Sequence, residues 1–148
     1  MTRAFLIKFT LLLNYIEIIT SKILWEMLKH AKSWLTNLDR ASDDRKEHSV
    51  RAVRNVIIAS RETAVYMRSM KDTGNQSHET EAHLSILWTE LSFALQDIGI
   101  TKLAKRCQIK GMHWANPNHY DEDFLQKADV GLERMEKLAN EILVQINR

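Results

Sequence analysis

Chain-breaking residues are so scarce that they constrain the fold more than any other feature, because 148 residues contain four glycines and one proline. These two residue types interrupt regular structure most strongly, so the elements between them have to be long. Apolar residues recur every three or four positions across residues 43–71, 77–99 and 121–147, which is the period of an amphipathic α-helix. No segment shows the alternation typical of a half-buried strand. The sequence therefore predicts an all-α fold.

Turn residues and glycines divide the chain into five expected helices, over residues 3–38, 43–71, 77–98, 102–110 and 121–147. Gly74 follows the second helix and Gly111 is expected to end the fourth, since glycine is common just beyond a helix. Residues 112–120 would then form an irregular loop. Short connections favour antiparallel neighbours. We predict one domain, residues 1–148, folded as an antiparallel up-down four-helix bundle with one additional short helix between the third and fourth long helices.

Size, charge and cysteine content limit the class of protein. A chain of 148 residues is large enough to bury its own core without disulfides, and it has the single cysteine Cys107, which we expect to pack as a small hydrophobic side chain. This composition favours a cytoplasmic protein. Lys and Arg number 21 against 19 Asp and Glu, a net charge of +2, so nucleic-acid binding is not expected.

The apolar N-terminal stretch resembles a membrane span or a signal peptide more than any other segment does. Charged residues decide against both, because Lys8, Glu17 and Lys22 interrupt the stretch and leave no run of 18 apolar residues. We expect no membrane association, and we interpret residues 3–38 as a buried helix.

This first helix carries two apolar faces. Phe5, Phe9 and Leu12 begin one face, and a second face about 130° away contains Leu11, Tyr15, Ile18 and Trp25. A helix in a four-helix bundle needs one buried face, so the second face predicts association with another copy of the chain, as a homodimer, or with a partner protein. The alternative is a broad core contact inside one subunit.

Three arginines along residues 43–71 are spaced seven apart and could form a phosphate-binding edge. If the second and third helices form a hairpin about residue 75, these arginines lie level with three carboxylates, and structural pairing is then the better interpretation. The expected pairs are Arg54 with Asp97, Arg61 with Glu90, and Arg68 with Glu81. Exposed pairs of this kind add about 0–1 kcal/mol each.

Metal and cofactor motifs are missing from the sequence. His78 and His83 are five residues apart, whereas histidines that chelate a metal on one helix are four apart, and the Glu-x-x-His pairs of di-iron bundles do not occur. Gly-rich phosphate loops and nucleophile motifs are missing too. We therefore expect no metal, no cofactor and no assignable catalytic residue.

Arg106 and His113 are separated by six residues. This spacing resembles the Arg-x4–6-His signature of the HEPN ribonucleases, which are small helical bundles that work as dimers. The resemblance implies that the pair engages an RNA phosphate, with both residues on or at the end of one helix, and that the chain cleaves RNA. It covers this spacing alone. Because we expect Gly111 to break the helix between the two residues, the sequence departs from the family there.

The segment around residues 110–120 is the best candidate for a binding site. Irregular loops on rigid scaffolds often carry binding residues, and this one is rich in aromatic, amide and basic side chains. The candidates are Arg106, Lys110, His113, Trp114, Asn116, His119 and Tyr120. The alternative interpretation is that Trp114 and Tyr120 close one end of the bundle.

Three functions remain open. The first is a non-enzymatic, cytoplasmic interaction or regulatory protein, acting as a homodimer and offering the first helix and the 110–120 loop to partners. The second is a small-molecule binder with an aromatic pocket between helices, since bundle interiors house ligand sites. Its expected lining is Trp25, Trp34, Trp88 and Trp114 with nearby methionines. The third is the HEPN-like ribonuclease.

Overall fold

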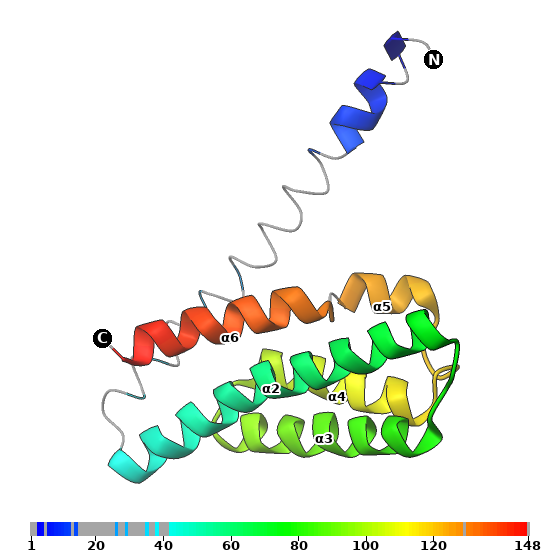
Figure 1. Cartoon of the computed structure of the whole chain (residues 1–148). Coiled ribbons are helices and arrows are strands. Elements are labelled where there is room, and N and C mark those ends of the chain that lie inside the picture. The colour runs from blue at the N-terminus through cyan, green and yellow to red at the C-terminus, as the bar shows by residue number, and fades with distance from the viewer. Residues whose placement is uncertain are drawn as a thin grey trace.

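The computed structural model describes residues 42–128 and 130–147, together with residues 3, 4, 6–12, 14, 26, 29, 35 and 38. In this part of the chain all regular structure is helical and no strand is present, which confirms the all-α prediction. The helices that are described throughout are α2 (Asp43–Thr73), α3 (His78–Asp97), α4 (Thr101–Ala115), α5 (Glu122–Ala128) and α6 (Leu132–Ile146) (Figure 1). None of the described helices is both long and apolar enough to cross a bilayer.

The ends of α2 and the start of α3 follow from capping residues in the sequence. Ser42 precedes α2, and its side chain accepts a hydrogen bond from the backbone N–H of Arg45. Gly74 ends α2 with φ 70°, a left-handed conformation that glycine adopts without strain, and its N–H bonds to the Met70 carbonyl. Ser77 caps α3 by accepting from the N–H of Thr80. The predicted boundaries here are confirmed to within two residues.

The predicted break at Gly111 is wrong. Helix α4 passes through Gly111 and continues to Ala115, so the short helix 102–110 and the loop 112–120 are replaced by a 15-residue helix and a shorter irregular segment. Gly111 is required for close packing, because a β-carbon there would collide with the Thr89 hydroxyl and press on the Ser85 carbonyl. Ser85 also donates a 2.9 Å hydrogen bond to the Gly111 carbonyl. The glycine therefore lets α4 approach α3 and does not end the helix.

The predicted last helix, 121–147, is wrong as one element, because it is divided into α5 and α6. Gly131 caps α6 in an extended conformation, with φ −60° and ψ 135°. The carbonyl of Val130 accepts a hydrogen bond from the Lys110 side chain. This bond links α4 to the connection between α5 and α6 at Val130.

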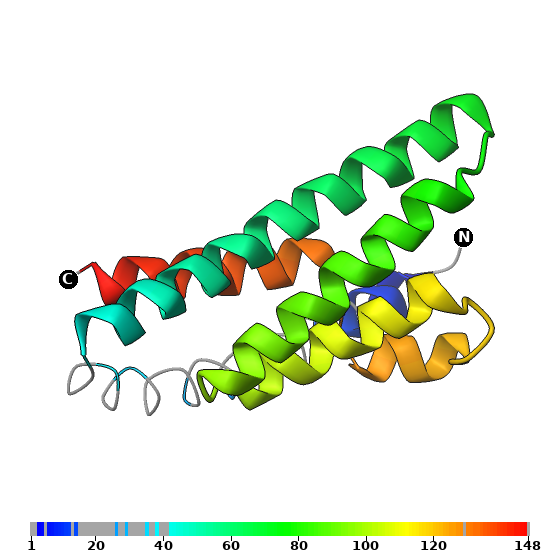
Figure 2. The ribbon, with the colours of Figure 1, turned by 90° about the horizontal axis from the view of Figure 1, so that it is seen from below.

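Packing divides the helices into two closely associated pairs. Helix α3 packs most extensively against α4, and α2 against α6, while α2 and α3 form a further contact (Figures 1 and 2). Trp88 is fully buried at the centre, where its indole N–H donates a 2.9 Å hydrogen bond to the Thr63 hydroxyl. The largest apolar side chains around it are Leu84, Leu95, Ile100, Leu103, Met135, Leu138 and Ile142.

None of the three predicted arginine pairs forms an ion pair among the described residues. Arg61 instead binds Glu136 of α6, with Nη2 and Nε at 3.0 and 3.1 Å from the same carboxylate oxygen. The link between α2 and α3 is made by His83 and Glu62, whose Nε2 and Oε2 atoms are 3.0 Å apart. The register prediction is wrong for Arg61 because the face of α2 that carries it turns toward α6.

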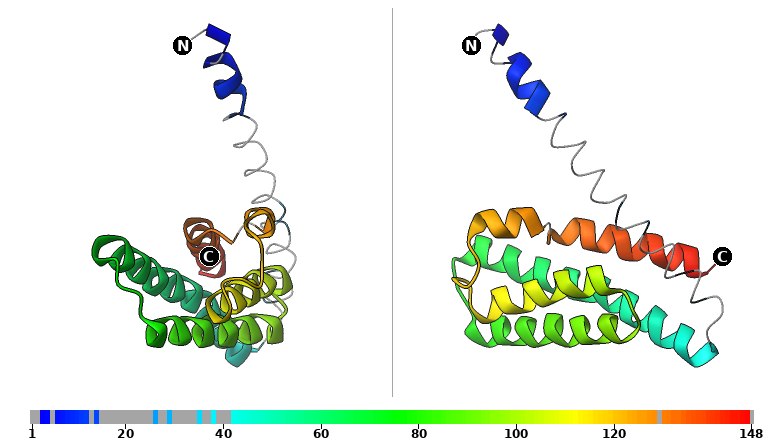
Figure 3. Two further views of the ribbon diagram at one scale, coloured as in Figure 1. Left: turned by 90° about the vertical axis from the view of Figure 1, so that its right-hand side faces the viewer. Right: turned by 180° about the vertical axis from the view of Figure 1, so that it is seen from behind.

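Most of the predicted first helix lies outside the described residues, including Tyr15, Ile18 and Trp25 of its second apolar face. The residues of 3–38 that are described are all helical. Leu38 is buried in the core, but Leu6, Ile7, Phe9, Leu11 and Leu12 are 50–61% exposed. The prediction of a buried helix is therefore wrong for residues 6–12, which stand apart from the five helices in both views of Figure 3.

Candidate functional site

A cavity of about 510 Å³ lies where the α2–α3 turn, the last turns of α4, and α5 come together. Six of its lining residues are apolar and the other four carry polar or ionisable groups. The lining residues are Met67, Met70, Gln76, Glu81, Lys110, His113, Trp114, Pro117, Leu125 and Val130. Three of the seven predicted binding residues, Lys110, His113 and Trp114, are therefore in its wall. We call this volume the main cavity.

The ammonium group of Lys110 lies against protein groups. Its Nζ donates a 3.0 Å hydrogen bond to the Val130 carbonyl and is 5.3 Å from the ring centroid of Trp88. Within residues 42–128 and 130–147, no carboxylate is within ion-pair distance of Nζ. Burial lowers the pKa of Lys110 from 10.5 to about 8. A cation that is desolvated in this way in a cavity wall is typical of a functional site.

His113 lies three residues beyond Lys110 on α4 and is half-buried. Its ring meets the Trp114 ring edge to face, with centroids 6.1 Å apart. Burial, and then the positive charge of Lys110, lower the pKa of His113, which favours the neutral imidazole. Its Nδ1 atom is buried with no hydrogen-bond partner in the described part of the chain. Most buried polar atoms in folded proteins have a hydrogen-bond partner, so this nitrogen is available to a group in the cavity.

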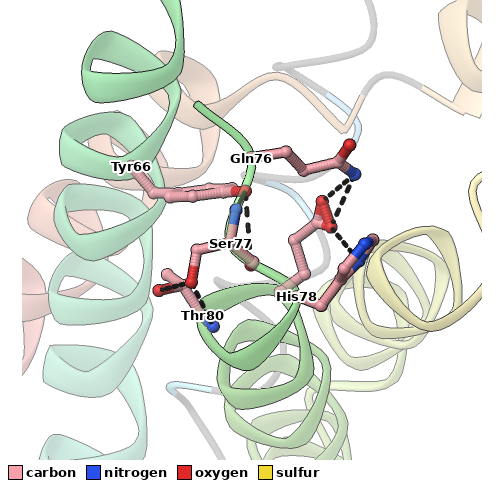
Figure 4. A network of polar contacts seen from close by, with 6 residues as sticks. Tyr66, Gln76, Ser77, His78 and Thr80 are labelled. Atoms are coloured by element: carbon pink, nitrogen blue, oxygen red, sulfur yellow. Dashed lines mark hydrogen bonds and ion pairs between the residues drawn. The ribbon is translucent and has the colours of Figure 1, made fainter. Parts of the chain in front are cut away.

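Glu81 supplies a carboxylate to the main cavity from the first turn of α3. Its side chain is buried, and both carboxylate oxygens accept hydrogen bonds from Nε2 of Gln76, at 2.6 and 3.1 Å. Nδ1 of His78 lies 3.9 Å from the same carboxylate (Figure 4). The cavity wall therefore holds one potential anion and one potential cation that are not paired with each other.

Tyr66 fixes the turn that carries this carboxylate. Its hydroxyl accepts a 3.0 Å hydrogen bond from the N–H of Ser77 and donates to the carbonyl of the same residue at 3.4 Å. Ser77 in turn accepts from the N–H of Thr80, so the last turns of α2 and the start of α3 are tied together (Figure 4). These bonds hold the turn next to Gln76, which lines the main cavity.

Trp114 also contacts a second cavity. Its ring packs edge to face on Tyr66, with centroids 5.6 Å apart. The second cavity, of about 420 Å³, shares Gln76, Glu81, Trp114 and Pro117 with the first. Trp114 therefore lines both cavities.

The other four predicted binding residues lie away from the main cavity. Asn116 follows the C-terminus of α4, where its N–H bonds to the Met112 carbonyl and its side chain accepts from the N–H of Asn118. His119 and Tyr120 pack edge to face with centroids 4.6 Å apart, and Tyr120 stacks on Phe124 at 4.6 Å. These residues shape the connection from α4 to α5.

Arg106 and His113 share one face of the continuous helix α4, because seven residues correspond to almost two full turns. The expected helix break between them is therefore wrong, and the arrangement that the ribonuclease resemblance requires along one helix is present. Nη1 of Arg106 donates to the Lys102 carbonyl at 3.4 Å. Lys110, between the two residues on the same face, directs its ammonium to Val130.

Cavity residues from other segments escaped the sequence-based prediction. Glu81 carried a usable signal, since it lies three and seven residues before Leu84 and Trp88 and so occupies the buried stripe of α3. Met67 and Met70 were covered only by the general expectation of methionines in a pocket, and Leu125 carried no signal, because an apolar side chain on a helix looks the same whether it meets the core or a hollow.

The predictions for Cys107 and for the four tryptophans had different outcomes. Cys107 is fully buried in the core, which confirms its predicted packing, and burial raises the pKa of its thiol. Of the four tryptophans expected around a pocket, Trp88 is in the core and Trp114 lines the main cavity, with Met67 and Met70 nearby. Trp25 and Trp34 lie outside the described residues.

No group of three or more histidine, cysteine, aspartate or glutamate side chains in the described part of the chain could hold a metal ion. Comparison of the whole chain with models of protein families, with curated proteins and with solved structures gave no match. The chemistry of the main cavity therefore has to be inferred from its own residues.

Proposed function

We propose that this protein binds a small organic molecule in the main cavity, as a non-enzymatic cytoplasmic binding protein. The observation that carries the proposal is the combination, in one wall, of apolar side chains with a desolvated ammonium at Lys110 and a buried carboxylate at Glu81. Ligand sites are concave and mainly apolar, and a few polar groups fix the orientation of the ligand.

The volume and the lining limit the ligand. A cavity of about 510 Å³ is within the range of about 300–1,000 Å³ typical of small-molecule sites. Met67, Met70 and Leu125 favour an apolar body, and Trp114 favours a flat or aromatic one. The ligand's polar head would meet Lys110 and Glu81 at one side.

A thermal-shift experiment with 4-isopropylbenzyl alcohol tests the proposal, because this probe has an apolar aromatic body and an uncharged polar head. At a probe concentration ten times the dissociation constant, binding stabilises the folded protein by about 1.4 kcal/mol. This raises the melting temperature by about 3–6 °C for a domain of this size. Native mass spectrometry should show one bound molecule for each chain.

Leu125→Trp and Gln126→Trp form a matched pair of variants on α5. Leu125 lines the main cavity and the neighbouring Gln126 is exposed. The larger side chain at position 125 should fill the cavity and remove the thermal shift, while the same change at position 126 should leave it intact. An unchanged shift in Leu125→Trp, or no shift in the parent protein at saturating probe, would contradict the proposal.

A second proposal concerns the N-terminal helix and self-association. One end of the predicted helix, at Leu38, is buried in the core, whereas the apolar side chains of residues 6–12 are at least half exposed. We propose that residues 3–38 supply the fourth long helix of an antiparallel bundle and that residues 6–12 extend beyond it to contact a second copy. Exposed contiguous apolar surface of this kind marks protein–protein contacts.

Light scattering after size exclusion tests the homodimer. Leu11→Lys places a charge on the exposed apolar segment and should convert the dimer to a monomer. Phe93→Lys is the control, since Phe93 is 62% exposed on α3, away from that segment. A parent protein that elutes as a monomer, or a dimer that only Phe93→Lys disrupts, would overturn this second proposal.

A further inference from the structure

The ammonium group of Lys110 has a setting in the main cavity that binding alone does not require. Nζ is fixed by one hydrogen bond to the Val130 carbonyl, above the Trp88 ring. Both Lys110 and Val130 line the cavity, so this hydrogen bond is made at the cavity wall. A neutral amine held by one N–H keeps its lone pair for another partner.

The charges that line this cavity are mixed. Glu81 is one of the lining residues, so a carboxylate or phosphate bound in the cavity would also meet a negative group. The titratable groups that interact with Lys110 itself are Cys107 and His113 on α4. The side chains that α2 and α5 contribute to the lining, those of Met67, Met70 and Leu125, carry no charge. An uncharged polar head suits this wall best.

We propose that Lys110 is a nucleophile that forms a reversible imine with an aldehyde or ketone ligand in the main cavity. This inference rests on the proposed binding function and specifies its ligand class as an apolar carbonyl compound. The Nζ lone pair forms a bond to the carbonyl carbon while an amine proton passes to the carbonyl oxygen. The resulting hydroxyl then leaves as water with the second amine proton, and the C=N bond forms. No oxidant or reductant is consumed.

Protonation supports this chemistry, because only the neutral amine attacks a carbonyl. With a pKa of about 8, about a quarter of Lys110 side chains are neutral at pH 7.5, compared with about one in a thousand for an ordinary lysine. A weaker base is also a poorer nucleophile, as is documented for thiols, which offsets part of this gain. The expected advantage over surface lysines is on the order of tenfold.

The test traps the imine. The protein is incubated at pH 7.5 with a limiting amount of 4-isopropylbenzaldehyde and cyanoborohydride, and peptide mass spectrometry locates the reduced adduct. Among the lysine side chains we expect one main adduct, at Lys110, formed about ten times faster than at Lys102 or Lys105, which are exposed on the same helix. The rate at Lys110 relative to that of an ordinary lysine side chain should fall as the pH rises from about 8 to 10, because Lys110 gains little further neutral amine above its own pKa.

Variants and a matched probe separate the two proposals. Lys110→Arg keeps the positive charge but removes the nucleophile and should abolish the main adduct, while Lys102→Arg should retain it. If Lys110→Arg does not fold, the pH dependence of labelling at Lys110 in the parent protein tests the imine instead. Should 4-isopropylbenzyl alcohol shift the melting temperature while the aldehyde labels Lys110 no faster than Lys102, the imine is refuted and the binding function stands. Absence of both effects refutes both proposals.

Discussion

Replacing Lys110 by methionine should stabilise the protein at pH 7, even though the change removes a hydrogen bond. The difference between the ordinary pKa of 10.5 and the value of about 8 corresponds to roughly 3 kcal/mol of lost stability while the side chain is charged. Methionine removes this desolvation cost and keeps an unbranched side chain. Losing the bond to Val130 and the contact with the Trp88 ring costs roughly 2 kcal/mol together. The expected net gain is about 1–2 kcal/mol.

The pH dependence of this stability difference tests the reasoning more sharply than its size at pH 7 does. Between about pH 8 and 10.5, native Lys110 has lost its proton while the unfolded chain still holds one, so the parent gains stability with rising pH relative to the variant. The advantage of Lys110→Met is therefore complete below about pH 8, and toward pH 10.5 it reverses, because the desolvation cost has gone and the loss of the bond to Val130 remains. Urea unfolding of both proteins at several pH values measures it, and in thermal unfolding the gain at pH 7 is about 2–8 °C.

Lys102→Met is the control, because Lys102 is exposed on the same helix and the change should alter stability by less than about 0.5 kcal/mol. Comparing variant with parent cancels the opposite contribution of Cys107, whose raised pKa is common to both proteins. A Lys110→Met variant that is less stable at pH 7, with a difference that does not change between pH 7 and 10.5, would refute the desolvated ammonium.

Three further predictions follow from packing and hydrogen bonding. Gly111→Ala should lower the free energy of unfolding by about 1–2 kcal/mol through the collision with Thr89, whereas Gly131→Ala, with no neighbouring atom within 4 Å, should be nearly neutral in the same urea titration. Thr63→Val should cost about 1–3 kcal/mol because it removes the acceptor of a buried indole N–H, and Thr63→Ser should cost less. The parent should not degrade single-stranded RNA; cleavage that His113→Ala abolishes would instead support the ribonuclease.

The sequence predicted the helix ends well where the residue type at the end has a single structural role. Ser42, Gly74 and Ser77 are caps in the structure because their side chains or their backbone freedom satisfy helix ends directly. Gly111 shows the limit of such signals. The same residue type serves as a helix stop or as a close-packing position, and only the neighbouring Thr89 decides between them.

The main cavity was predictable in part. Lys110, His113 and Trp114 were found because they cluster in one stretch of sequence, but the cavity also needs Met67 from α2 and Glu81 from α3. Which faces of separate helices converge depends on packing angles that a single sequence does not encode locally. The pairing of Arg61 with Glu136 instead of Glu90 is a second instance, since it depends on how α2 is rotated toward α6.

The bond between Trp88 and Thr63 has a consequence for how this sequence can change over time. Apolar core positions tolerate exchange among residues of similar volume, because contacts between them have no direction. A hydrogen bond from a buried indole N–H does have a direction. The N–H reaches the Thr63 hydroxyl only when α2 has one particular rotation about its axis relative to α3. Positions 63 and 88 should therefore vary together in any related chains, with the hydroxyl lost only where the indole is lost as well.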